Sequence, residues 1–246
     1  MHHELWFTRF LNDYLAAPAN AILGIVGWQA TNPQRPWANY ISMEILAALI
    51  LVVVFAMLRS SLSMDKPGKL QHMMEAIWEF LNGEAHQMVG HGYGKYVGLF
   101  TTLFIFVLVG NLMGAIPTLE SPTMYPAVTL GCALIAFFYY NIVGISAVGI
   151  GKYLAHFAGP NLFMAPLMIP IEIVSHLARP LSLTIRLYAN MLAGEQVTLV
   201  FLGLTYLVVP AMFMGLHVFV GFLQAYVFAA LTMIYVGGAV AHEEEH

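Results

Sequence analysis

Long apolar runs dominate this chain and recur at the length of a membrane helix. Residues 41–58, 96–116 and 127–150 each approach the roughly 20 apolar residues that a helix needs to cross a bilayer. Two longer runs follow, at residues 162–202 and 211–240. Because the first of these is about twice the length that a perpendicular span requires, we expect the two to form a long, tilted hairpin. The pattern predicts an all-α polytopic membrane protein with five membrane-embedded helices.

Residues 70–88 follow a different pattern. Leu70, Ile77 and other apolar residues recur at helical spacing, whereas Glu75 and Glu79 belong to a polar side. This distribution predicts an amphipathic helix that lies on the cytoplasmic membrane surface. A helix packed against a soluble partner would show the same pattern.

The first 39 residues are only moderately apolar. Asp13 and Pro18 interrupt the stretch, and the basic region that begins a signal peptide is missing. We expect residues 1–39 to form an outside, interfacial segment and not a span. The whole chain, residues 1–246, is then a single membrane domain.

Positive charges give the expected orientation. Arg59, Lys66 and Lys69 follow the first span, and Lys152 follows the third, while the loop around Glu120 carries neither lysine nor arginine. Lysine and arginine next to a span mark the cytoplasmic side. We therefore expect the N-terminus outside and the C-terminus in the cytoplasm. Because there is no organelle transit peptide, the bacterial inner (plasma) membrane is the expected location.

Composition excludes several classes of function. Of 246 residues, 60% are hydrophobic and 9% are charged, whereas soluble domains carry about 25% charged residues. The nine lysines and arginines are too scattered for a nucleic-acid surface. Cys132 is the only cysteine, so no internal disulfide can form. None of the ten histidines has the spacing of a helical metal site, and there is no phosphate-binding loop of the P-loop type. We expect no metal, cofactor or nucleotide site.

The run of residues 162–202 contains an unusual polar stripe. Six residues fall within about 40° of one line on an ideal helix: Glu172, Ser175, Arg179, Ser182, Arg186 and Asn190. An arginine at the centre of a membrane helix costs about 2.5–3.5 kcal/mol on insertion scales, and Arg186 has no acid at i±3 or i±4. The stripe therefore needs water or a protein partner. Snorkelling to the headgroups is the alternative, and it is the role we expect for Arg179.

A second set of polar residues lies at matching depths of the predicted hairpin. Glu195 is about 180° away from the arginine stripe. If the chain turns near Tyr206, then Glu195 opposes His217, and Arg186 falls near Gln224. A carboxylate beside an imidazole can pass protons near neutral pH. A buried, hydrogen-bonded structural pair would explain the same spacing.

These residues also carry a family resemblance. The run Arg179–Glu195, RPLSLTIRLYANMLAGE, resembles the signature of subunit a of F-type ATP synthase, with Tyr188-Ala189 in place of the Phe-Gly often found there. The resemblance extends more loosely from about residue 40 to the C-terminus. It implies a stator subunit in the membrane proton path that is not itself an enzyme. The implied partners are a rotating subunit c ring, the subunit b peripheral stalk, other ATP synthase subunits and membrane lipid.

The resemblance implies a role for each group. Arg186 would face a carboxylate of the subunit c ring and separate two offset half-channels. Glu195 and His217 would line the half-channel by which protons enter. From their chemistry and position alone, the amides of Asn190 and Gln224 can bond water in that half-channel, and we expect Glu172, Ser175 and Ser182, which extend inward from Arg186, to line the exit half-channel. A self-contained secondary transporter or ion channel is the alternative, but such a protein should supply its own counter-ion for Arg186. A purely structural assembly subunit would leave the polar stripe unexplained.

Cysteine labelling tests the orientation. Glu120→Cys places a thiol in a loop that we expect outside, whereas Cys132 lies in an apolar run. A membrane-impermeant maleimide should label position 120 from outside only, and Lys66→Cys, the matched control, from the cytoplasmic side only. Labelling of position 120 solely from the cytoplasmic side would contradict the topology.

Overall fold

Helices make up the described chain. The computed structural model describes residues 4–25, 32–63, 66–90, 92–116, 118–151, 153, 165–204 and 208–241, and no strand occurs among them. The helices are α1 (Trp6–Ile25), α2 (Asn39–Ser61), α3 (Lys69–Val89), α4 (Val97–Met113), α5 (Pro126–Val148), α7 (Ala165–Leu204) and α8 (Val208–Ala241), with short 3₁₀ turns η1 (Tyr93–Lys95) and η2 (Pro122–Met124). The all-α class predicted from the sequence is confirmed for these residues.

Four helices are long and apolar enough to cross a membrane. They are α2, α7, residues 126–147 of α5 and residues 208–240 of α8. The predicted span of residues 96–116 corresponds to α4, which is apolar but has only 17 residues. Five membrane-embedded helices therefore remain a prediction. Lys152, residues 162–164, Tyr206 and the tail of residues 242–246, which entered the sequence predictions, lie outside the described residues.

Proline and glycine residues set several helix boundaries. Pro126 is in the first turn of α5, where its missing N–H costs nothing and its fixed φ suits a helix. α5 stops at Gly149, whose φ is +83°, and α3 stops at Gly90, whose φ is +79°. A positive φ is strained for side chains with a Cβ, so glycine ends both helices at low cost.

α7 continues through two prolines. A single helix of 40 residues contains both Pro170 and Pro180. Pro180 is buried against the bundle, and the Thr184 hydroxyl donates a 2.8 Å hydrogen bond to the Pro180 carbonyl. Packing against neighbouring helices thus holds the helix together where proline removes one backbone hydrogen bond.

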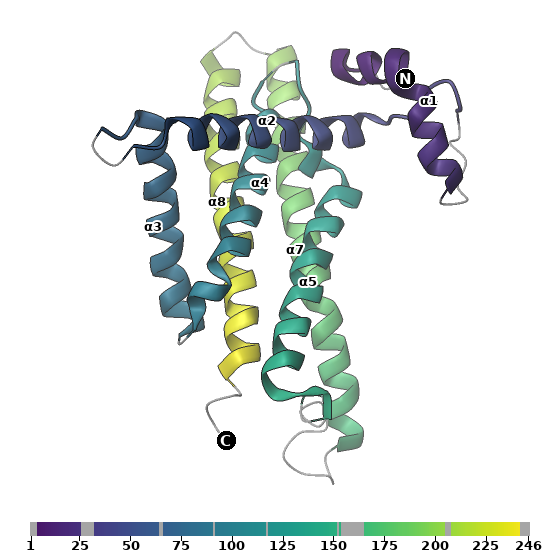
Figure 1. The fold of residues 1–246 in the computed structure, drawn as a ribbon. Helices are drawn as coiled ribbons and strands as arrows, with labels where there is room; N and C mark the ends of the chain where they lie inside the picture. The colour runs from purple at the N-terminus through teal and green to yellow at the C-terminus, as the bar shows by residue number, and fades with distance from the viewer. Residues whose placement is uncertain are drawn as a thin grey trace.

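The long helices form one packed group with α8 at its centre. α3, α4, α5, α7 and α8 lie side by side, and α8 contacts each of the other four (Figure 1). The largest fully buried side chains include Phe100, Phe104, Tyr140, Phe228 and Met233. These aromatic and flexible apolar side chains fill the space between the helices.

α2 runs across this group instead of alongside it. It crosses near the end where α7 stops and α8 begins (Figure 1). Only 17% of the most apolar stretch of α2 is buried inside the structure, against 39% for α8. α2 and the α7–α8 pair therefore cannot all lie along the membrane normal.

The N-terminal segment folds back on the start of α2. α1 is kinked at Leu15 and packs against α2. The Asn12 side chain donates to the Trp37 carbonyl at 3.2 Å and accepts from the Trp37 N–H at 3.0 Å. Glu4 and Arg35 form an ion pair in the same region. α1 is not among the helices apolar enough to span a membrane.

α3 packs its apolar side closely against α8. Leu81, Ala85 and Val89 are buried, and a Cβ added to Gly237 would overlap the carbonyl oxygen of Met88. A Cβ on the next residue, Gly238, would meet nothing within 4 Å. The α3–α8 contact therefore requires glycine at position 237 but not at position 238.

The two glycines provide a matched test of this contact. Alanine favours a helix over glycine by about 1 kcal/mol at either position, so the difference between variants reports the packing. We expect Gly237→Ala to be less stable than Gly238→Ala by about 1–3 kcal/mol, the typical cost of overpacking. Unfolding of the purified protein in detergent measures this difference, and equal stability of the two variants would contradict the close approach.

Candidate functional site

The register of the α7–α8 pair is set by two side-chain contacts. Asn190 Nδ2 donates a 2.9 Å hydrogen bond to Gln224 Oε1. Nearer the turn, the rings of Phe201 and Phe213 stack with their centroids 4.3 Å apart. This register lies close to the reflection about Tyr206 that the sequence predicts. Two residues proposed for the same half-channel, Asn190 and Gln224, are thus in direct contact.

His217 lies in a gap that two glycines leave open. Its side chain is buried, and a Cβ on Gly194 of α7 would overlap Nδ1 of the imidazole. A Cβ on Gly114, after α4, would come within 3.3 Å of Nε2. The imidazole therefore occupies space that any other residue at position 194 would fill.

Glu195 and His217 line one cavity. Its volume is about 160 Å³, and its wall includes Gly114, Thr198 and Met214. Glu195 Oε2 and both ring nitrogens of His217 are buried without a hydrogen-bond partner among the described residues. Buried polar atoms that face a cavity with room for several waters are sites for ordered water. The arrangement suits water-mediated proton transfer between a carboxylate and an imidazole.

A buried hydrogen-bond network supports this cavity. Thr123 of η2 donates to Asn111 Oδ1 at 2.6 Å, and Asn111 Nδ2 donates to the Gly221 carbonyl of α8 at 2.8 Å. The Ser121 hydroxyl donates to the Gly110 carbonyl at 2.9 Å. The network ties α4, η2 and α8 together beside Gly114. Hydrophobic periodicity could not reveal Ser121 or Thr123, because they lie beside and within the short turn η2, outside the long helices.

The adjacent loop holds an acidic residue in place. The Tyr125 hydroxyl donates a 2.8 Å hydrogen bond to Glu120 Oε2, and its ring packs on Tyr40 at 5.5 Å between centroids. Burial and the Glu120 hydrogen bond raise the pKa of Tyr125 above its usual range. Tyr125 therefore remains a donor at physiological pH, and the loop keeps its contact with Glu120.

Arg186 faces out of the bundle. Its side chain is exposed on α7, and so are Leu181 and Ile185, at 56% and 53% exposure. Ser182 and Asn190 are exposed on the same side. Among the residues that the structure describes, no carboxylate forms an ion pair with this arginine. Its positive charge therefore lies on the outer face of α7, where a neighbouring protein chain or lipid would contact it.

The far end of the polar stripe makes contacts within the bundle. Glu172 and Ser175 are half-buried. Glu172 Oε1 lies 3.6 Å from Nδ1 of His176, at the i+4 position. The sequence predictions omitted His176, although an acid and a histidine four residues apart on a helix are a readable signal.

Arg179 differs from expectation. Its guanidinium lies over the rings of Tyr140 and Tyr235, at 5.7 and 5.3 Å from their centroids. We expected this side chain to snorkel to the headgroups, but two aromatic faces from α5 and α8 hold it by cation–π contacts. A sequence pattern cannot show these partners, because they come from different helices. Arg179 thus joins α5, α7 and α8.

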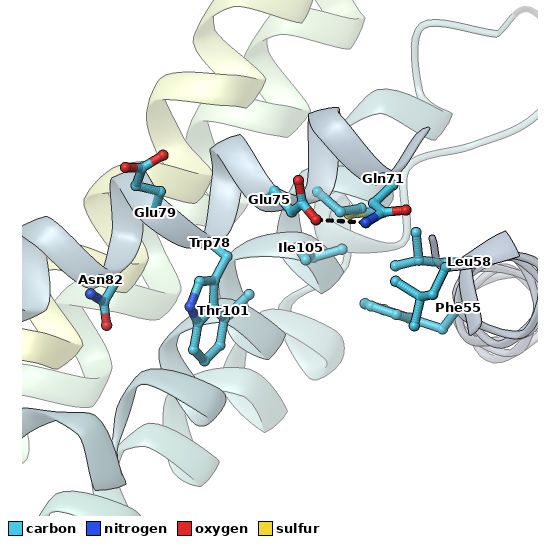
Figure 2. A pocket seen from close by; sticks show the side chains of 11 residues that line it. Phe55, Leu58, Gln71, Glu75, Trp78, Glu79, Asn82, Thr101 and Ile105 are labelled. Atoms are coloured by element: carbon cyan, nitrogen blue, oxygen red, sulfur yellow. Dashed lines mark hydrogen bonds between the residues drawn. The ribbon is translucent and has the colours of Figure 1, made fainter. Parts of the chain in front are cut away.

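A larger cavity than the one beside Glu195 lies elsewhere. It measures about 500 Å³ and is lined by residues of α2, the segment that follows it, α3 and α4, among them Phe55, Trp78 and Ile105 (Figure 2). Gln71 donates to Glu75 at 2.8 Å on its edge (Figure 2). No residue of α7 or α8 contributes to its wall. It therefore plays no part in the arrangement around Arg186.

Metal chemistry finds no support in the described residues. They contain no group of three or more histidine, cysteine, aspartate or glutamate side chains that could hold a metal ion. The chemistry available in the α7–α8 pair is proton transfer through carboxylate, imidazole and water, next to a permanent positive charge.

Comparison with known proteins identifies the family. The family described as "ATP synthase A chain" matches residues 41–237. The chain is 62% identical over 232 residues to "ATP synthase subunit a" of Solibacter usitatus (strain Ellin6076), covering 94% of this chain and 99% of that protein. It is 48% identical over 242 residues to the protein of the same name from Koribacter versatilis (strain Ellin345), covering 98% and 99%.

A double-mutant cycle tests the α7–α8 register. We expect Asn190→Ala and Gln224→Ala to show a coupling free energy of about 0.6 kcal/mol, typical of hydrogen bonds between membrane helices. Thr198→Ala is the matched control, because its hydroxyl bonds the Gly194 carbonyl of its own helix. Unfolding in detergent measures the cycle. Coupling of Gln224 to Thr198 as strong as to Asn190 would contradict the register.

Proposed function

Because the chain belongs to the ATP synthase subunit a family, we propose that it is the stator subunit of the membrane proton channel of an F-type ATP synthase. The observation that carries the mechanism is the outward-facing Arg186, with no ion-pair partner among the described residues. The subunit is not an enzyme by itself. Phosphoryl transfer takes place on other subunits of the complex.

Arg186 acts as a fixed charge. A guanidinium does not lose its proton in proteins, so it cannot relay one. The matching carboxylate then belongs to another chain, and the rotating ring of subunit c would supply it. A positive charge within a few ångströms favours the ionised carboxylate. Each ring site would release its proton as it approaches Arg186 and take up a new one after passing it.

Two separate water paths would serve this exchange. Glu195 and His217, with the amides of Asn190 and Gln224, form the half-channel by which protons enter. Two observations support this: Glu195 and His217 line one cavity, and Asn190 donates a hydrogen bond to Gln224. The exit half-channel uses Glu172, Ser175 and Ser182 on the other side of Arg186. Each proton that crosses provides about 2.3 kcal/mol per 100 mV of membrane potential.

The helix geometry supports a tilted arrangement in the membrane. A helix of 40 residues is about 60 Å long, whereas the hydrocarbon core is about 30 Å thick. α7 would therefore tilt strongly, as would α8 beside it. α2, which crosses them, would then lie closer to the membrane normal (Figure 1). α3, parallel to α8, would rest on the cytoplasmic surface.

The remaining assignments follow this arrangement. The membrane would contain α2, α4, α5, α7 and α8, with the N-terminus outside and the C-terminus in the cytoplasm. The subunit b stalk would bind the same assembly in the bacterial inner membrane. A self-contained transporter is less well supported, because such a protein should place an acid opposite Arg186 on its own chain.

Replacement of Arg186 tests the mechanism. We expect Arg186→Ala to insert and assemble but to lower ATP-driven proton pumping by more than tenfold, because the ring carboxylate loses its counter-charge. Arg186→Lys should restore little, since an ammonium lacks the planar fork and can lose its proton when desolvated. Pumping is measured in vesicles that contain equal amounts of assembled complex.

Ile185→Ala is the matched control. Ile185 is exposed on the same side of α7 but carries no charge. This variant should pump at close to the normal rate. Near-normal pumping by Arg186→Ala would refute the mechanism.

A further inference from the structure

A buried cluster of polar side chains lies at the start of α7, away from Arg186. The His176 side chain is only 12% exposed. Its Nε2 lies 3.2 Å from the Tyr153 hydroxyl, which donates to Asn141 Oδ1 at 2.7 Å. Its Nδ1 faces Glu172. The cluster thus connects α5, Tyr153 and α7.

The hydrogen bonds assign the tautomer of the imidazole. Asn141 Nδ2 donates to the Phe137 carbonyl at 2.7 Å, so the amide oxygen is the atom that faces Tyr153. The Tyr153 hydroxyl gives its one hydrogen to that oxygen. In its contact with His176, the Tyr153 hydroxyl oxygen must therefore be the acceptor, so Nε2 carries the ring N–H hydrogen. The lone pair of neutral His176 is then on Nδ1.

Nδ1 is placed to exchange protons with Glu172. The distance from Nδ1 to Oε1 is 3.6 Å, slightly longer than a direct hydrogen bond but within reach of one water or of an ion pair. When Nδ1 takes a proton, the imidazolium pairs with the carboxylate. When the proton moves to Glu172, the imidazole returns to its neutral form, so one proton is passed on and His176 is unchanged.

The charged and titratable groups around His176 do not block proton exchange between Nδ1 and Glu172. Two residues of α7 on either side of His176 in the sequence, Glu172 and Arg179, carry opposite charges. From α5, the ring centroid of Tyr140 lies 5.7 Å from that of the His176 imidazole. Tyr235 of α8 contacts Tyr140, and both rings hold the guanidinium of Arg179. Arg179 is therefore engaged by aromatic faces, while the acid faces Nδ1 directly.

We propose that His176, through Nδ1, is a proton-transfer residue at the cytoplasmic mouth of the exit half-channel, with Glu172 as its partner and Tyr153 and Asn141 as positioning residues. The proposal rests on the proposed function, which gives Glu172 to this half-channel. During ATP-driven pumping, protons enter the membrane here from a cytoplasm that contains few of them. An imidazole that collects protons near neutral pH would keep uptake fast as the pH rises.

The pH dependence of pumping tests the proposal. In inverted vesicles the cytoplasmic face is in contact with the medium, so its pH can be varied directly. His176→Gln in the assembled complex should pump like the unmodified protein near pH 6 but at least threefold more slowly at pH 8.5. Added imidazole should restore the rate of His176→Ala at high pH.

A second histidine–glutamate pair serves as the matched control. His72 lies 3.9 Å from Glu75 on the exposed side of α3. His72→Gln should leave the pH profile unchanged. Tyr153→Phe removes the acceptor for Nε2–H and should shift the profile in the same direction as His176→Gln. If His176→Gln does not assemble, Tyr153→Phe carries the test.

Two outcomes would overturn the proposal. One is a pH profile of pumping by His176→Gln that matches the unmodified protein. The other is an equal loss of pumping rate at every pH that imidazole does not restore, which would indicate a purely structural role for His176. Both are read in a complex that retains Arg186. Failure of this proposal is thus distinct from failure of the proposed function, which normal pumping by Arg186→Ala would show.

Discussion

The close antiparallel packing of α7 against α8 is the constraint on which the rest of the site depends. Gly194 lets the two helices approach until the His217 imidazole fills the space of a missing side chain. The hydrogen bond from Asn190 to Gln224 fixes the register farther along. In a membrane, helices gain no hydrophobic advantage from pairing, so close packing and such polar contacts determine how they associate.

This packing separates two kinds of polar chemistry. Arg186 and Glu195 are about 180° apart on an ideal helix, and the structure places one outside the bundle and the other on a cavity inside it. A proton path through Glu195 and His217 therefore opens on a different side of α7 from the arginine. The fixed charge and the titratable pair can serve one exchange reaction without forming an ion pair that would neutralise both.

Polar networks around the hairpin hold it at both ends. Beside the Glu195–His217 cavity, Asn111 donates to the Gly221 carbonyl of α8 and accepts a hydrogen bond from Thr123 of η2. Toward the start of α7, Arg179 joins three helices through aromatic rings. Buried polar groups are costly unless they are satisfied, so each network specifies one arrangement of the helices it connects.

The sequence alone determined the helical class, most helix positions and the opposite faces of Arg186 and Glu195, because these follow from the local period of a helix. It also indicated the depth at which Glu195 and His217 meet, since the rise per residue is constant along both helices. Only the tertiary structure decided that α2 crosses the other helices, that α7 continues through Pro180 and that Arg179 stacks on Tyr140. It alone joined His176 to Tyr153. These features depend on side-chain packing between helices distant in sequence, for which a local pattern carries no information.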